Sequence, residues 1–338
     1  MISIQESHSL QPRKCKFETL WTVSLDDIIS DALLLRDQKE ILVVTISESF
    51  YRISIHDGKI IAKINFQQTL SNNVTNYKIL GQSKKNTIVY SSDGAKMNFF
   101  HLTAKKRKCV DYSDYSKGTW VLTSLFLSSR SILLIIDNKF VINFYTQKNG
   151  WKRPALKIRI PNRSAIPRSS SAMKIGACSL FDEALIAIRL IRGKQEELFY
   201  YSIIHQKWLT ERAVLHMFAT QDLRDSTIIN TPWIHQGDCL SLANQFAMTH
   251  NPVRRTNDMR LLMEIDNIQQ ICFLREKGTV LASFTQDPSI HVWERVAEGW
   301  HLGAVGKFQE VLKLIPLSNS MFSYTNFNPE FVCLKISY

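Results

Sequence analysis

The stretch DALLLRDQKEILVVTISESFYRISIHDGKIIAKINFQ (31–67) consists of four short apolar segments joined by turns. Within it, SFYRISI (49–55) alternates apolar and polar side chains, which is the pattern of a half-buried β-strand. KFVINFY (139–145) alternates in the same way. Sustained helical periodicity is hard to find along the chain, so the sequence predicts a protein built mainly of β-strands.

The same order of four strands recurs along the chain. Further groups lie at 76–115, 119–161, 172–219 and 268–305, and a blurred one lies at 226–265. The last group (311–337) supplies three strands, and FETLWTVS (17–24) at the other end of the chain supplies the fourth. Seven groups in 338 residues average about 48 residues each, near the spacing of β-propeller blades. We therefore predict an all-β fold, with residues 1–338 forming a single β-propeller domain of seven blades closed by the N-terminal strand in the last blade.

One segment carries a family resemblance. ASFTQDPSIHVWE (282–294) resembles the WD-repeat family, whose repeats run Ser-Gly-Ser-x-Asp-x-Thr-Ile-Arg-Val-Trp-Asp. Asp287 falls on the turn aspartate and Trp293 on the tryptophan, while Glu294 replaces the final aspartate. The resemblance implies that Asp287 accepts hydrogen bonds across the blade and that Trp293 packs inside it. Asp137 occupies the same turn position in the third group, with Asn143 where the tryptophan would stand.

Composition excludes several protein classes. Hydrophobic residues make up 45% of the chain and charged residues 21%, which is ordinary for a folded protein and excludes bulk disorder. No apolar run approaches the roughly 18 residues of a membrane span, and the start of the chain lacks the apolar run of a signal peptide. We therefore expect an intracellular protein, cytoplasmic or nuclear, that is not secreted.

The cysteines are scattered singly and form no C-x-x-C pair. We interpret all six as buried free thiols in a reducing compartment: Cys15, Cys109, Cys178, Cys239, Cys272 and Cys333.

Sequence motifs of catalysis are missing. The nine histidines include no H-x-H or H-E-x-x-H spacing, and the chain has neither a G-x-S-x-G elbow nor a glycine-rich phosphate loop. We predict no catalytic residues, no metal, no cofactor and no small-molecule substrate. An enzyme whose carboxylates converge in a central channel from different blades stays open as the third hypothesis.

Charge is distributed unevenly along a chain of net charge +12. From Asn138 to Phe181 there is no Asp or Glu, while nine Lys and Arg occur. RIPNRSAIPRSSSAMK (159–174) reads as an exposed loop between the third and fourth blades, and KKRK (105–108) as a turn after the alternating strand of the second blade. The candidate partner-binding residues are Lys105, Lys106, Arg107, Lys108, Lys148, Lys152, Arg153, Lys157, Arg159, Arg163 and Arg168.

Such a surface fits an acidic protein segment, nucleic-acid phosphate or anionic lipid, or it serves solubility alone. Trp151 and Trp120 are suitable stacking aromatics for RNA, although tryptophan also fills blade cores. The leading hypothesis is a non-catalytic scaffold for protein–protein interaction in an intracellular multiprotein complex, with a nucleic-acid-containing assembly as one such setting. Its partners would be other protein subunits bearing an acidic segment. The alternative is direct RNA or DNA binding by the basic surface of blades two to four.

Overall fold

Six four-stranded antiparallel sheets account for nearly all of the described chain. The computed structural model describes residues 16–66, 77–91, 95–103, 107–161, 173–180, 183–192, 195–210, 212–214, 268–274, 279–284, 289–296, 299–308, 311, 313–318, 320–325 and 328–337. The predicted all-β class is confirmed.

The first three sheets follow one another along the chain with strands in sequential order. The first contains β2 (Ile29–Leu34), β3 (Glu40–Thr45), β4 (Ser49–Ser54) and β5 (Ile60–Asn65). The second contains β6 (Lys78–Gln82), β7 (Thr87–Ser91), β8 (Lys96–His101) and β9 (Arg107–Asp111). The third contains β10 (Val121–Leu127), β11 (Ile132–Asp137), β12 (Val141–Thr146) and β13 (Pro154–Arg159). Short 3-10 turns, η1 (Tyr115–Lys117) and η2 (Gln147–Asn149), lie in the connections.

The remaining sheets complete the series. The fourth contains β14 (Met173–Leu180), β15 (Leu185–Arg192), β16 (Gln195–Ser202) and β17 (Lys207–Leu209). The next contains β18 (Ile268–Leu274), β19 (Thr279–Phe284), β20 (Ser289–Val296) and β21 (Gly299–Lys307). The terminal sheet, so named because it joins both ends of the chain, contains β22 (Lys313–Pro316), β23 (Met321–Thr325), β24 (Glu330–Ser337) and β1 (Lys16–Ser24).

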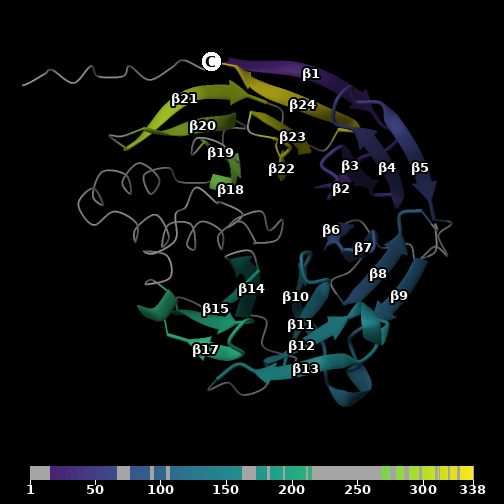
Figure 1. Cartoon of the computed structure of the whole chain (residues 1–338), viewed down its shortest axis with the longest axis vertical. Coiled ribbons are helices and arrows are strands. Elements are labelled where there is room, and N and C mark those ends of the chain that lie inside the picture. The colour runs from purple at the N-terminus through teal and green to yellow at the C-terminus, as the bar shows by residue number, and fades with distance from the viewer. Residues whose placement is uncertain are drawn as a thin grey trace, which may run out of the picture.

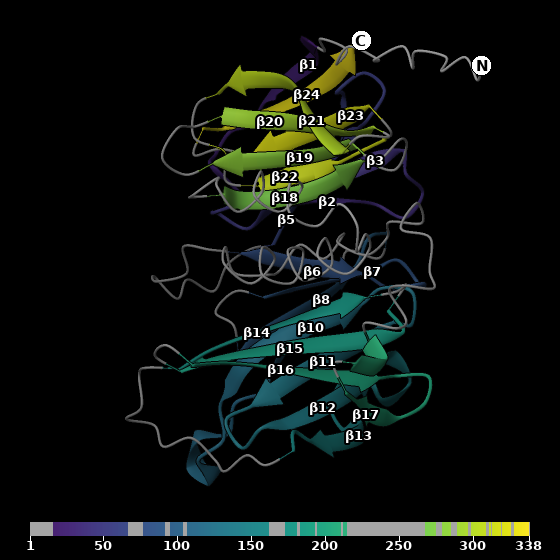
Figure 2. The same cartoon turned by 90° about the vertical axis from the view of Figure 1, so that its left-hand side faces the viewer.

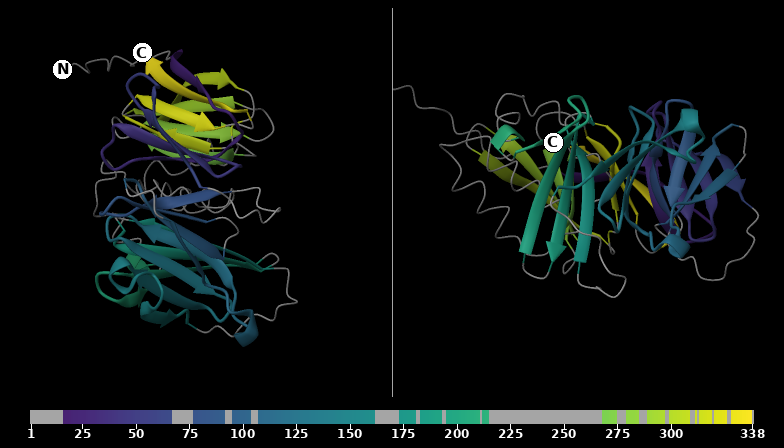
Figure 3. Two further views of the ribbon diagram at one scale, coloured as in Figure 1. Left: turned by 90° about the vertical axis from the view of Figure 1, so that its right-hand side faces the viewer. Right: turned by 90° about the horizontal axis from the view of Figure 1, so that it is seen from below.

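The sheets are arranged around a common centre (Figure 1). The first strand of each sheet, such as β2, β6 and β10, lies inward, and the fourth strand, such as β5, β9 and β13, lies on the outside (Figure 1). Seen from the side, the sheets stand next to one another with strongly twisted strands (Figure 3). The sheets β14–β17 and β18–β21 do not adjoin (Figure 2). The group at 226–265 lies outside the described residues, so seven blades and a closed ring stay predictions.

Apolar layers between neighbouring sheets form the core. One cluster, including Ile41, Phe331 and Cys333, joins the terminal sheet to the first sheet. Four more join the first to the second, the second to the third, the third to the fourth, and β18–β21 to the terminal sheet. Since each fully buried aliphatic or aromatic side chain contributes about 1.5–3 kcal/mol, these layers dominate stability.

The N-terminal strand pairs with the last strand, as predicted. β1 runs antiparallel to β24, from Lys16 opposite Ser337 to Ser24 opposite Glu330. Trp21 anchors it, because its indole Nε1 donates a hydrogen bond of 2.8 Å to the Ile55 carbonyl of the first sheet. The first and last described strands are thereby held in one sheet.

Many hairpin turns place a residue other than glycine in the left-handed region. Eight non-glycine residues with φ between +50° and +65° lie in turns between consecutive strands: Gln38, Glu48, Asn86, Ser131, Phe140, Trp151, Glu183 and Gln206. Asp137 shows how such a turn is held. Its carboxylate accepts from the backbone N–H groups of Lys139 (3.0 Å) and Val141 (3.1 Å) and from the Asn143 amide (3.0 Å). These local bonds offset the cost of the left-handed residue.

One predicted strand is misplaced. The apolar segment AVLHMFA (213–219) predicts the fourth strand of the group at 172–219, but the fourth strand of this sheet is β17, and residues 212–214 are helical. Trp208 explains the difference, since its ring packs edge-on against Phe199 and Tyr201 and so anchors β17.

The thiols also differ from the prediction. Cys333 is buried, and burial raises its pKa to about 11. Cys109, by contrast, is exposed on the outer strand β9. The side chains of the other four cysteines lie outside the described set.

Gly58 offers a test of the contact between β1 and the first sheet. It has a φ of +70°, and a Cβ atom there would stand 2.8 Å from Cδ2 of Trp21. Gly118 is a matched control, with a φ of +62° and nothing within 4 Å of a Cβ. We expect Gly118→Ala to lower the free energy of unfolding by about 1 kcal/mol through backbone strain alone, and Gly58→Ala by about 1–2 kcal/mol more. Urea denaturation measures both; equal losses would show that Trp21 does not lie over Gly58.

A truncation tests the role of the whole strand. Deleting residues 1–24 removes β1 and leaves the edge of β24 exposed. The loss of Phe17 and Trp21 from packing should cost at least about 3 kcal/mol, which corresponds to a melting temperature lower by roughly 6 °C or to aggregation. Deleting residues 1–15 is the control, because it leaves β1 complete. A chain without β1 that melts like this control would contradict the strand's structural role.

Candidate functional site

The site is built around the outer strand of the third sheet and the turn that leads into it. Gly150 and Trp151 are consecutive residues with left-handed φ, at 61° and 63°. Trp151 is 3% exposed, and its ring stacks on Phe99 of the second sheet at 5.0 Å with an interplanar angle of 16°. Burying this ring fixes the turn and directs the flanking residues to the surface.

Five exposed cations lie in this turn and on β13. They are Lys148, Lys152, Arg153, Lys157 and Arg159, and we call them the basic edge. In the part of the chain that the structure describes, no carboxylate forms an ion pair with Lys148, Lys152, Arg153 or Lys157. The acid-free tract of the sequence thus gives a surface whose positive charge is not neutralised locally.

Lys108 extends this charge from the second sheet. Its ammonium group donates a hydrogen bond to the Gly150 carbonyl of the turn. Desolvation lowers the pKa of Lys108, and the nearby charge of Lys152 lowers it further. Lys108 of the second sheet and Lys152 of the third sheet therefore lie close enough for their charges to interact.

Arg107 has a different role. Its Nη1 lies 2.8 Å from Oε1 of Glu48, which is 2% exposed, and its Nε donates to Asn98 at 3.2 Å. Glu48 also accepts a hydrogen bond of 2.6 Å from the hydroxyl of Tyr90. Because Glu48 belongs to the first sheet and Tyr90 and Arg107 to the second, the three residues hold two sheets together. We therefore leave Arg107 out of the basic edge. Nothing in the sequence pattern singled out Glu48.

The other candidate residues are placed as follows. Lys105, Lys106, Arg163, Arg168 and Asp287 lie outside the described residues. Arg107 and Lys108 belong to β9, so this half of the KKRK tract is strand and not the predicted turn. Trp293 lies in β20 opposite Val280 and Leu302, and its side chain is outside the described set. The burial of Trp151 removes it as a stacking surface for RNA, while Trp120 is half-buried.

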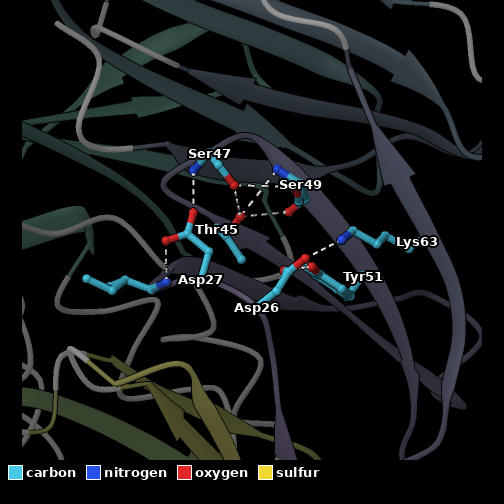
Figure 4. Close-up of polar contacts among 8 residues, drawn as sticks. Asp26, Asp27, Thr45, Ser47, Ser49, Tyr51 and Lys63 are labelled. Carbon is cyan, nitrogen blue, oxygen red and sulfur yellow. Dashed lines mark hydrogen bonds and ion pairs between the residues drawn. The ribbon is translucent and has the colours of Figure 1, made fainter.

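Outer strand β5 shows how a cation is neutralised elsewhere on the ring. Lys63 of β5 reaches Asp26, whose carboxylate also accepts a hydrogen bond from the Tyr51 hydroxyl (Figure 4). Beside it, Asp27 accepts from the backbone N–H groups of Ile28 (2.7 Å) and Ser47 (2.9 Å). This polar cluster uses its carboxylates to order a turn of the first sheet. Among the described residues, no carboxylate neutralises Lys148, Lys152, Arg153 or Lys157 in this way.

Among the described residues, no three His, Cys, Asp or Glu side chains gather closely enough to hold a metal ion. Within the same residues, no helix has the length and apolar character needed to cross a membrane.

Comparisons with known proteins show similarity in structure alone. No family model matches the sequence, and no curated protein matches it significantly. A chain from the crystal structure of a mitotic checkpoint complex matches with a TM-score of 0.54 and 7% identity, covering 100% of this chain and 97% of that chain. The β-propeller domain of Cps50 (Swd1) from Myceliophteria thermophila has a TM-score of 0.48 and 11% identity, covering 95% of this chain and 100% of that domain. The arrangement of four-stranded antiparallel sheets around a common centre confirms the β-propeller fold, and the comparisons carry nothing further at such identities.

The two kinds of cation predict different mutational effects. Arg107→Ala would leave the buried carboxylate of Glu48 without its positive partner. We therefore expect the free energy of unfolding to fall by about 2–3 kcal/mol. Lys152→Ala should change it by no more than about 0.5 kcal/mol, because this side chain is exposed. Urea denaturation measures both variants.

Adding Glu48→Gln to Arg107→Ala should recover part of the lost free energy of unfolding, because the double variant no longer buries an unpaired negative charge at position 48. If Arg107→Ala were as mild as Lys152→Ala, Arg107 would be a surface cation and would belong to the basic edge.

Proposed function

We propose that this protein is a non-catalytic interaction scaffold, a WD-repeat-like propeller subunit of an intracellular multiprotein complex. The chain forms one propeller domain over residues 1–338, with seven blades, and it works in the cytoplasm or nucleus. Its basic edge binds an acidic segment of another subunit. The observation that carries this proposal is that four exposed cations of this edge, Lys148, Lys152, Arg153 and Lys157, have no carboxylate partner in the described chain.

The rigidity of the packed sheets supports a binding role. The buried layers between sheets fix the backbone, and inter-sheet polar bonds add to them. Asp31 of β2 accepts a hydrogen bond of 2.8 Å from the backbone N–H of Ile79 in β6, and it is 3% exposed. A surface that is already ordered loses little conformational entropy on binding, which leaves more of the contact energy as affinity.

The electrostatics of the basic edge favour a negatively charged partner. Desolvation is the main cause of the lowered pKa of Lys108, and repulsion by the charge of Lys152 adds to it, so placing the two cations together is unfavourable in the isolated protein. A carboxylate brought by a partner would relieve this repulsion. Each exposed ion pair contributes only about 0–1 kcal/mol to binding, so several pairs must act together. The electric field of the whole edge mainly raises the association rate and selects a partner of negative charge.

A charge-reversal variant tests the proposal. Replacing Lys148, Lys152, Arg153 and Lys157 by Glu should reduce partner recovery in affinity purification by at least about tenfold, from four lost and reversed contacts. The control variant replaces Lys39, Lys84, Lys85 and Lys207 by Glu, which gives the same change in net charge on exposed sites of other sheets. We expect the control to retain its partners, and both variants to melt near the wild-type temperature.

Nuclease treatment separates this function from direct nucleic-acid binding. Partner recovery should be the same with and without nuclease. Labelled single-stranded RNA should bind both variants equally and weakly. Tight RNA binding lost in the basic-edge variant, with log affinity falling by about 0.7 per phosphate contact per unit of log salt concentration, would instead establish the nucleic-acid function.

A further inference from the structure

Among the described strands, none pairs with the outer edge of β13, which leaves this edge available to a further strand. β13 ends the strand order β10-β11-β12-β13, and no described strand pairs with its outer side. Pro154 begins the strand and Pro161 follows it, so the usable edge is confined to the residues between two prolines that cannot donate hydrogen bonds.

Backbone geometry shows which residues face outward. The N–H of Ile160 donates to the Phe140 carbonyl at 2.8 Å, so position 160 bonds inward to the β12 side. Bonding directions alternate along an antiparallel strand, and the register has Ile158 opposite Ile142 and Lys157 opposite Asn143. Ile158 therefore bonds inward, and the N–H and C=O groups of Lys157 point away from the sheet.

The two faces of this edge differ in chemistry. Lys157 and Arg159 share one face, since side chains alternate along a strand. Leu156 and Ile158 share the other face, where Ile158 packs against the apolar layer between the third and fourth sheets and Leu156 is 41% exposed. A strand lying along this edge would meet positive charge on one face and apolar surface on the other.

The other described outer strands of the first three sheets lack this combination. On β5, Lys63 is neutralised by Asp26. On β9, Arg107 pairs with Glu48, and Lys108 bonds to the Gly150 carbonyl. Exposed cations on a sheet edge prevent pairing with an identical edge of the same charge, and they leave pairing with an acidic strand favourable.

We propose that an extended acidic segment of a protein partner adds to β13 as an antiparallel fifth strand. Acidic residues of the segment lie on the face of Lys157 and Arg159, and apolar residues lie on the face of Leu156. Backbone hydrogen bonds give register, and the alternation of side chains gives specificity. The inference rests on the proposed function for the class of partner, and it adds the mode of binding.

The probe is a fluorescein-labelled octapeptide of alternating glutamate and valine. In the proposed pairing, the residue opposite Lys157 exchanges both backbone hydrogen bonds with it, and this residue is a glutamate. Methylating the backbone amide nitrogens of the glutamates should therefore weaken binding of the peptide to the full-length protein by at least about tenfold. The backbone nitrogens of the valines face away from β13, so methylating them should leave the affinity unchanged. An octapeptide of alternating lysine and valine should not bind.

Substitutions in the protein give a second measurement. Lys157→Pro removes the outward N–H without removing a bond of the ladder, because prolines are tolerated where the N–H faces solvent. Lys157→Ala removes the charge and keeps the N–H. We expect the proline variant to lose at least about tenfold in affinity for the glutamate-valine peptide and the alanine variant about threefold, with unchanged melting temperatures. If Lys157→Pro fails to fold, the methylated peptides still decide the question on the wild-type protein.

Each outcome is decisive. Equal binding of the two methylated peptides would overturn strand addition, and charge alone would then account for binding. If only methylation of the valine nitrogens weakened peptide binding, the antiparallel orientation would be overturned. No binding of the glutamate-valine peptide, or stronger binding of single-stranded RNA, would also overturn the inference. The scaffold function fails only if the charge-reversal variant keeps its partners in affinity purification, so the two failures are distinguishable.

Discussion

Sheets that are apolar on both faces are the constraint on which this structure depends. In β3, Val43 and Val44 point to opposite faces, and both are fully buried. β7 and β11 are buried in the same way along most of their length. Antiparallel sheets commonly leave one face to water, but these sheets cannot, so each needs a neighbour on both sides. The arrangement of sheets around a common centre meets that need wherever two described sheets adjoin, and it leaves outer strands and turns as the surface.

Inter-sheet packing also decides what a charged residue can do. Arg107 and Lys108 are adjacent in sequence and belong to the same outer strand. Arg107 lies against the buried carboxylate of Glu48, so its charge stabilises the joint between two sheets. Lys108 points to the next sheet and joins the field of the basic edge. Composition counts both as positive charge, yet only the second is available to an acidic partner.

The sequence predicted the strands of most sheets because alternation of side chains and short turns are local signals. It placed β1 beside the last strand, since the final group contained three strands and the N-terminus supplied another. It failed at 207–219, where two short apolar segments compete for one strand position and the choice depends on the contacts of Trp208 with Phe199 and Tyr201.

Properties that depend on contacts between sheets could not be predicted in this way. The acid-free tract located the basic edge, because an absence of carboxylates can be read along the chain. The burial of Trp151, the exposure of Cys109 and the pairing of Arg107 required knowledge of which sheets are neighbours.

Trp151 links the stability of the fold to the proposed binding surface. Its left-handed φ carries a cost of about 1–3 kcal/mol, which is offset by stacking on Phe99 in the layer between two sheets. Since Lys152 and Arg153 follow directly in the chain, the buried ring holds their backbone in place while their charged groups stay in water. The start of β13 is then ordered before any partner arrives, and the outward backbone groups of Lys157 are presented together with the exposed cations. An edge held in this way would gain a strand without reorganising the fold, which is the physical condition for a scaffold that binds through a sheet edge.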